Sequence, residues 1–200
     1  IQLSATLGAP FYSVHSGFIT DPAPDAFNGT SFVFPEPTSE QAATQALDRF
    51  VATLGDLLSV ADAAGINLLI ENNVCTPDMV GKLLLQQTDE FTELFERINQ
   101  PRLGILCDTG HLNVSAHTLG FDRIDFVRDL QQHIRGFHLH DNDGTADQHQ
   151  PVAEGSWIFE ALSSIDHDVL GVNEAGFEHV DDLGAHCQWL EKRVNELYSY

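Results

Sequence analysis

The chain has 200 residues, of which 42% are hydrophobic, so it can bury the core of one domain or most of one. Thirty Asp and Glu residues against nine Lys and Arg give a net charge of −21 at pH 7, which argues against a protein that binds the phosphates of a nucleic acid. The sequence holds no apolar run of about 18 residues, so we expect no membrane span.

The cysteines favour a reduced compartment. Three cysteines cannot all pair with one another, and Cys75 and Cys107 fall at or just past predicted strand ends. We therefore expect a cytoplasmic protein. Because the first residue is Ile1 and not methionine, we expect the natural N-terminus, with any targeting signal on it, to lie outside this sequence.

Strands and helices are predicted to alternate along the whole chain. The first helix is opened by the capping signal Thr38-Ser39-Glu40 and ended by Gly65. We expect strands at 11–14, 66–70, 103–107, 134–139 and 169–172, and helices at 39–64, 88–98, 121–133, 157–164 and 181–197. This alternation predicts parallel strands, in either an open doubly wound sheet or a closed β/α barrel.

Side chains that bind metals decide between these two architectures. In an open sheet, ligands gather at one switch point, whereas here every predicted strand delivers a polar group at the same end, as the strands of a closed ring do. The residues are His15, Glu71, Asp108, His111, His138, Asp147, His149 and Glu174. We therefore predict a (β/α)8 TIM barrel, with residues 1–200 as a single domain that lacks its N-terminal βα units.

The two strand-end pairs each leave alternatives open. Asp108 and His111 can share one ion or bind ion and substrate separately, and Asp108 can instead cap the next helix. His138 and His140 share a face if their strand continues, because side chains repeat every two residues along a strand.

Glu71 and Glu174 each close or follow an apolar strand, so each carboxylate needs a partner. A salt bridge would serve, but Lys82 is the one cation near Glu71 in sequence, so a divalent ion is the better candidate. Asp147 and His149 are predicted in a loop, either as metal ligands or as a solvated pair. His15 is either a ligand or a histidine satisfied within the barrel wall.

Five segments carry a resemblance to a known superfamily: IENN (70–73), CDTGH (107–111), HLHDNDG (138–144), DQHQPVAEG (147–155) and VNEAG (172–176). They resemble the xylose isomerase-like barrels, which include sugar isomerases and epimerases and the endonuclease IV type of DNA repair enzyme. The resemblance aligns this chain with the last five of eight βα units. It implies that Glu71 and Glu174 bind one divalent cation together and lie on either side of the substrate carbons. It also makes His138 a metal position, and in endonuclease IV relatives the pair matching Asp147 and His149 binds an additional metal.

From these residues and the resemblance we expect a sugar or sugar phosphate isomerase or epimerase. A divalent metal (Mn²⁺, Mg²⁺, Co²⁺ or Zn²⁺) held by Glu71, Asp108, His138 and Glu174 would polarise the sugar oxygens and stabilise an enediolate. One glutamate would take a proton next to the carbonyl and the other would return it, while His111 steadies a substrate oxygen. His15, His140, Asp147 and His149 are candidates for an additional metal or for substrate.

The sequence is also compatible with two other functions. One is an endonuclease IV-type zinc phosphodiesterase acting on abasic DNA, which the net charge disfavours. The other is a metal-binding barrel without catalysis. Because the first and last predicted strands would be exposed edges, we expect further residues of the protein or a second chain, as in a homo-oligomer, to cover them.

Overall fold

Five parallel strands form one sheet in the order in which they occur along the chain. The computed structural model describes residues 1–27, 33–37, 39 and 41–198. The strands are β1 (Phe11–His15), β2 (Asn67–Glu71), β3 (Leu103–Asp108), β4 (Ile134–Leu139) and β5 (Leu170–Asn173). The α-helices are α1 (Gln2–Thr6), α2 (Ala42–Ala64), α3 (Thr88–Arg97), α4 (Thr109–Leu119), α5 (Arg123–Leu130), α6 (Ile158–Ser163) and α7 (Val180–Leu197); η1 (Pro77–Met79) and η2 (Gln131–His133) are 3-10 turns.

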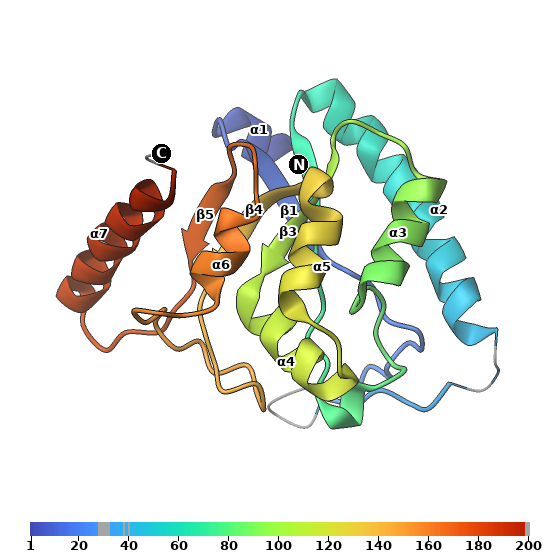
Figure 1. Ribbon diagram of the computed structural model, residues 1–200. Coiled ribbons are helices and arrows are strands. Elements are labelled where there is room, and N and C mark those ends of the chain that lie inside the picture. Colours follow the sequence, from blue (N-terminus) through green and yellow to red (C-terminus); the bar gives the residue numbers. More distant parts are fainter. Residues whose placement is uncertain (28–32, 38, 40, 199–200) are drawn as a thin grey trace.

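The strand order confirms the predicted barrel topology. Each strand pairs in parallel with the next one along the chain, without the reversal of order that marks a doubly wound sheet. The sheet curls into a half-barrel, with the helices on one side and the long loops at the end where the strands terminate (Figure 1). The fold is therefore α/β and is part of a TIM barrel.

The core lies between the sheet and its helices. All six residues of β3 are buried, as are Leu68, Leu69 and Ile70 of β2. Cys107 and Phe137 belong to the hydrophobic cluster. Because successive side chains of a strand point to opposite faces, their neighbours Asp108 and His138 point to the other face of the sheet. This alternation sends the polar side chains of β3 and β4 to the inner side of the half-barrel.

The predicted helix boundaries are mostly confirmed. Helix α2 begins at Ala42 and not at residue 39, and it ends at Ala64, where Gly65 caps it in the left-handed conformation (φ 70°) expected of a C-terminal glycine. The predicted capping residues Thr38 and Glu40 lie outside the described residues. Helix α3 begins at the predicted Thr88, where the side chains of Gln87 and Glu90 form a reciprocal capping box.

Helix α4 was not predicted, and the reason is physical. Its first eight residues are all buried, so it lacks the apolar stripe of an amphipathic helix, and it contains poor helix formers such as Gly110, Asn113 and Ser115. It begins at Asp108, whose side chain accepts a hydrogen bond from the backbone N–H of His111 at 2.8 Å. The short α1 was also missed, and the predicted helix 121–133 is divided into α5 and η2.

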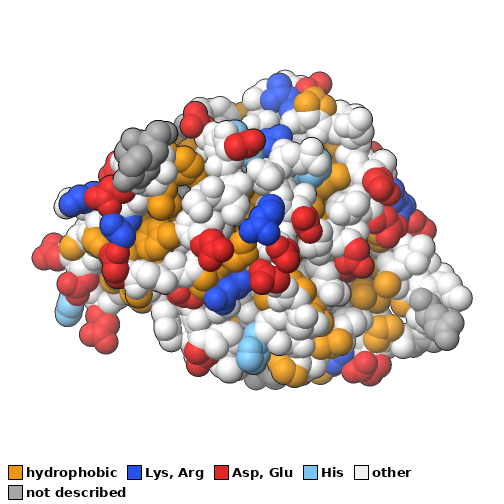
Figure 2. Space-filling view, viewed as in Figure 1, with side chains coloured by type: hydrophobic (Ala, Val, Ile, Leu, Met, Phe, Trp, Pro, Cys, Tyr) orange, Lys and Arg blue, Asp and Glu red, His pale blue; other side chains and the backbone are white. Residues whose placement is uncertain are grey.

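Strands β1 and β5 are the two edges of the sheet, each paired on one side within the described chain. Leu170 and Val172 of β5 are 45% and 40% exposed. No helix in the described parts of the chain has both the length and the apolar character needed to cross a membrane. Acidic side chains are spread over the helical face, and Lys or Arg side chains lie beside several of them (Figure 2).

Candidate metal centre

The carboxyl ends of four strands bring four predicted ligands to one place. Glu71 and Asp108 are the last residues of β2 and β3, His138 is the penultimate residue of β4, and Glu174 directly follows β5. Asp108 and His138 are partners in the β3–β4 ladder. Because parallel strands end at the same edge of a sheet, residues from four separate βα units lie next to one another.

These side chains surround a single nitrogen. Nδ1 of His138 lies 3.2 Å from Oε1 of Glu71, 3.5 Å from Oδ2 of Asp108 and 3.2 Å from Oε2 of Glu174. We call Glu71, Asp108, His138 and Glu174 the first cluster. Three negative charges thus converge at the inner side of the half-barrel.

Histidines are the only ion-pair partners of these carboxylates among the described residues. Lys82, the nearest cation to Glu71 in sequence, instead pairs with Glu36 at 2.9 Å. Burial alone would lower the pKa of His138, but hydrogen bonds to Asp108 and Glu71 and the nearby negative charges outweigh it and raise that pKa to about 10. Burial would raise the pKa of Asp108, yet hydrogen bonds from His138 and His140 hold it well below its usual range.

The first cluster fits a divalent cation. Glu71, Asp108 and His138 each offer one ligand atom, and these atoms lie within 4.8 Å of one another. Carboxylate oxygens with one imidazole suit Mn²⁺, Mg²⁺ or Co²⁺, and the imidazole also admits Zn²⁺. The cap and ligand alternatives for Asp108 are compatible, because Oδ1 caps α4 while Oδ2 faces His138.

Asn72 holds this arrangement in place, a role that the sequence did not predict. Its side-chain NH₂ donates to the backbone carbonyl of Asp108 at 3.1 Å, and its side-chain oxygen accepts from the Asp108 N–H at 2.8 Å. The backbone carbonyl of Asn72 accepts from Nδ1 of His111 at 2.9 Å. The only sequence signal was the place of Asn72 next to Glu71 in the segment IENN.

His111, Asp147 and His149 form a second cluster around one carboxylate oxygen. Oδ2 of Asp147 lies 3.4 Å from Nε2 of His111 and 3.1 Å from Nε2 of His149. Nδ1 of His149 lies 3.1 Å from the backbone carbonyl of Glu174, and Nδ1 of His111 lies 2.9 Å from that of Asn72. Because a carbonyl only accepts hydrogen bonds, both Nδ1 atoms carry a proton, which leaves both Nε2 atoms for a ligand.

The electrostatics of the second cluster resemble those of the first. Burial alone would lower the pKa of His111, but its hydrogen bond to Asp147 and the charge of Asp108 raise that pKa to about 9. Burial would raise the pKa of Asp147, yet the hydrogen bond and positive charge of His111 lower it. Asp147 is therefore not a solvated loop residue but a partner of α4.

The two remaining candidate histidines differ in their surroundings. The side chain of His15 is 65% exposed, and its Nε2 lies 3.9 Å from Oε2 of Glu71, so it is not buried in the barrel wall. His140 is fully buried one residue beyond β4, and its Nε2 contacts Asp108. The predicted alternation of His138 and His140 along one strand is thus interrupted, because β4 ends at Leu139.

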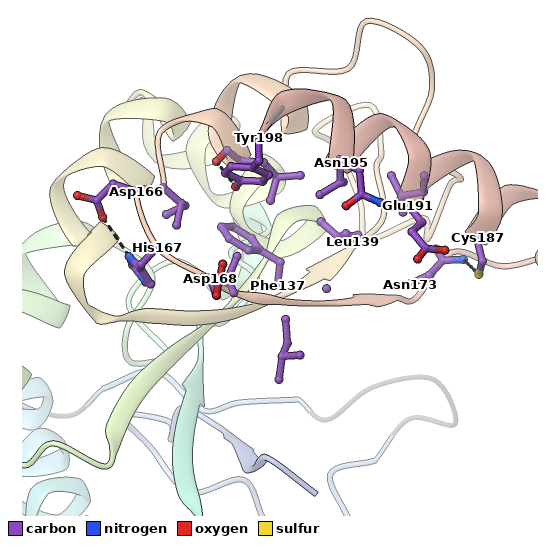
Figure 3. Close-up of a pocket in the computed structure, with 17 residues that line it drawn as sticks. Phe137, Leu139, Asp166, His167, Asp168, Asn173, Cys187, Glu191, Asn195 and Tyr198 are labelled. Atoms are coloured by element: carbon purple, nitrogen blue, oxygen red, sulfur yellow. Dashed lines mark hydrogen bonds and ion pairs between the residues drawn. The ribbon is translucent and has the colours of Figure 1, made fainter. Parts of the chain in front are cut away.

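An apolar cavity of about 700 Å³ lies elsewhere, between β5, α6 and α7. Phe137 and Leu139 line it (Figure 3). Because successive side chains of a strand point to opposite faces, these two lie on the face of β4 opposite His138. The residues lining this cavity include none of the candidate metal ligands. The candidate chemistry therefore stays at the strand ends.

Known proteins share this fold. The solved structure of a D-tagatose 3-epimerase-like protein matches with a TM-score of 0.69 and 21% identity, over 98% of this chain and 66% of that one. The IolI protein, solved with a bound zinc atom, matches with a TM-score of 0.61 and 16% identity, over 98% of this chain and 65% of that one. At these identities the likeness shows the fold alone.

A sequence relative is an uncharacterized protein of Methanocaldococcus jannaschii, 29% identical over 129 residues. The match covers 62% of this chain and 42% of the relative, so the chain spans less than two thirds of the length of these similar proteins. The model of the xylose isomerase-like TIM barrel family matches residues 1–193. The chain therefore belongs to the xylose isomerase-like TIM barrel family.

Proposed function

We propose that this chain carries the metal centre of a divalent-metal-dependent sugar isomerase or epimerase. One observation carries the proposal: three carboxylates from separate strands converge on Nδ1 of His138, and their only ion-pair partners among the described residues are histidines. Buried carboxylates without a Lys or Arg partner need another cation. The epimerase-like solved structure and the zinc-containing one support a sugar substrate and a metal on this fold.

The residues of the first cluster would hold the cation through Glu71, Asp108, His138 and Glu174. When bound, the cation supplies a positive charge that polarises a substrate carbonyl and stabilises the negative charge that develops on its oxygen. Asp108, fully buried and held by Asn72, would act only as a ligand.

Glu71 and Glu174 would exchange protons with the substrate. They approach His138 from β2 and from the end of β5, so a sugar bound above His138 would have one carboxylate on each side. One carboxylate removes the proton next to the carbonyl, which leaves an enediolate, and the other returns a proton to a neighbouring carbon or to the opposite face. The side chain of Glu71 is 7% exposed and that of Glu174 is 33% exposed, so the two have different access to solvent for exchanging their protons.

His111 would steady a substrate oxygen. Its Nδ1–H is fixed by the carbonyl of Asn72, so Nε2 is the nitrogen directed toward the second cluster. Asp147 and His149 would hold an additional cation there or orient the substrate. The zinc phosphodiesterase alternative uses the same clusters, but the net charge of −21 repels a DNA backbone.

The test is proton exchange at a defined carbon. The whole protein, loaded with Mn²⁺, is incubated in D₂O with a panel of aldoses, ketoses and their phosphates, and deuterium uptake next to the carbonyl is followed by NMR. We expect uptake with at least one sugar, and its loss in Glu174→Gln and Glu71→Gln. Turnover unchanged in Glu174→Gln, or incision of abasic duplex DNA without sugar exchange, would contradict the proposal.

A further inference from the structure

His140 lies between the two clusters. Its Nε2 is 3.0 Å from Oδ1 and 3.1 Å from Oδ2 of Asp108, which belongs to the first cluster. Its Nδ1 is 3.6 Å from Oδ1 of Asp147, which belongs to the second. Both Nδ1 of His140 and Oδ1 of Asp147 are buried without a hydrogen-bond partner among the described residues. Leaving such atoms unpaired costs about 1–3 kcal/mol each, so a fold that keeps them calls for an explanation.

The ring of His140 is held tightly on two sides. It stacks on the ring of His149 with centroids 4.2 Å apart and planes 15° from parallel. It also packs on the backbone of Gly110, where an added Cβ would lie 2.0 Å from Cε1 of the ring. Only glycine at position 110 leaves room for the imidazole.

The stack excludes one role for His140. Ligand atoms of His140, His149 and Glu174 lie within 4.8 Å of one another, as in a three-residue metal site. An imidazole binds a metal through a lone pair in the plane of its ring, however, and two parallel stacked rings direct these lone pairs side by side. His140 and His149 therefore do not share an ion. His140 does not contact a substrate either, because its Nε2–H donates to Asp108 and its side chain is fully buried.

We propose that His140 is a positioning residue that joins the two clusters. Its Nε2–H holds the carboxylate of Asp108 so that Oδ2 faces His138, and its other edge borders Asp147. This inference rests on the proposed function, because it takes the first cluster to bind a divalent cation. Residues that hydrogen-bond to a metal-binding side chain in this way typically contribute about 10–100-fold to metal affinity.

The test measures cation affinity and not turnover. Mn²⁺ or Co²⁺ binding to the whole protein is measured by competition with a chelator, and the Co²⁺ absorption spectrum reports the coordination. We expect His140→Phe, which keeps the ring and its stack but removes both nitrogens, to weaken binding about 10–100-fold and to change the Co²⁺ spectrum. His140→Gln, which keeps an N–H donor, should recover most of the affinity. The matched control is His133→Phe, because His133 also stacks on an aromatic ring but lies before the opposite end of β4.

Gly110→Ala provides an independent probe. The new methyl group would displace the ring of His140 without removing either nitrogen, so it should reproduce the loss of affinity. In the combined variant with His140→Phe the two losses should not add. Affinity in His140→Phe and Gly110→Ala equal to that of His133→Phe would overturn the inference and leave the proposed function standing. A wild-type protein that binds no cation would overturn both.

Discussion

Replacing Asn72 tests whether the metal centre is built on the end of the sheet. Asn72→Ala removes both hydrogen bonds between this side chain and the backbone of Asp108, at 3.1 and 2.8 Å. The backbone N–H and carbonyl of Asp108 are both buried, and each would lose its hydrogen-bond partner at a cost of roughly 1–3 kcal/mol. The free energy of unfolding should therefore fall by about 2–6 kcal/mol. This is a large share of a typical domain stability of about 5–15 kcal/mol.

The measurement is urea unfolding of the chelator-treated protein, followed by cation affinity of the folded variant. Asn67→Ala is the matched control, because Asn67 begins β2, the strand that Asn72 directly follows, and makes one long, exposed hydrogen bond of 3.4 Å to the carbonyl of Pro10. The control should change the stability by less than about 0.5 kcal/mol. Equal stability of the two variants, or wild-type Mn²⁺ affinity in Asn72→Ala, would show that Asn72 does not hold Asp108 in place.

Three further predictions concern charge and metal. In chelator-treated protein, His138 and His111 have folded pKa values of about 10 and 9, above the ordinary value of 6.5, so their contribution to stability should be full below about pH 6.5 and be lost as the pH rises through 9 to 10. Urea midpoints between pH 5 and 10 should therefore decline, and a flat profile would contradict the assigned contacts. Saturating Mn²⁺ or Zn²⁺ at about 1,000 times Kd should stabilise the protein by about 4 kcal/mol, and Glu174→Gln should greatly reduce the rise in Tm. Asp147→Asn should lower the pKa of His111, measured by NMR titration, because the hydrogen bond that His111 donates to Asp147 is the main cause that raises it; an unchanged titration would mean that the two side chains do not interact.

The strands and their common end could be predicted from sequence because buried parallel strands read as unbroken apolar runs, each closed by a polar residue. Leu68-Leu69-Ile70 before Glu71 is such a run. The convergence on His138 followed from the barrel topology without any knowledge of distances. That a cation binds there stays a prediction.

What could not be predicted depends on contacts that leave no periodic signal. Helix α4 is buried on all sides over its first two turns, so its sequence lacks an apolar stripe. The roles of Asn72 and His140 arise from hydrogen bonds to residues more than 30 positions away in the chain, and the fit of His140 depends on the absence of a side chain at Gly110. Such pairings become visible only once the strand ends are placed side by side.

Anomalous diffraction from crystals of the whole protein grown with Mn²⁺ or Zn²⁺ would locate a cation at the strand ends directly. We expect an ion at the first cluster, bound by oxygens of Glu71, Asp108 and Glu174 and by Nδ1 of His138, with Zn²⁺ at about 2.0–2.2 Å from these atoms. An ion that contacts none of the three carboxylates, or no ion at these strand ends at saturating metal, would contradict this expectation.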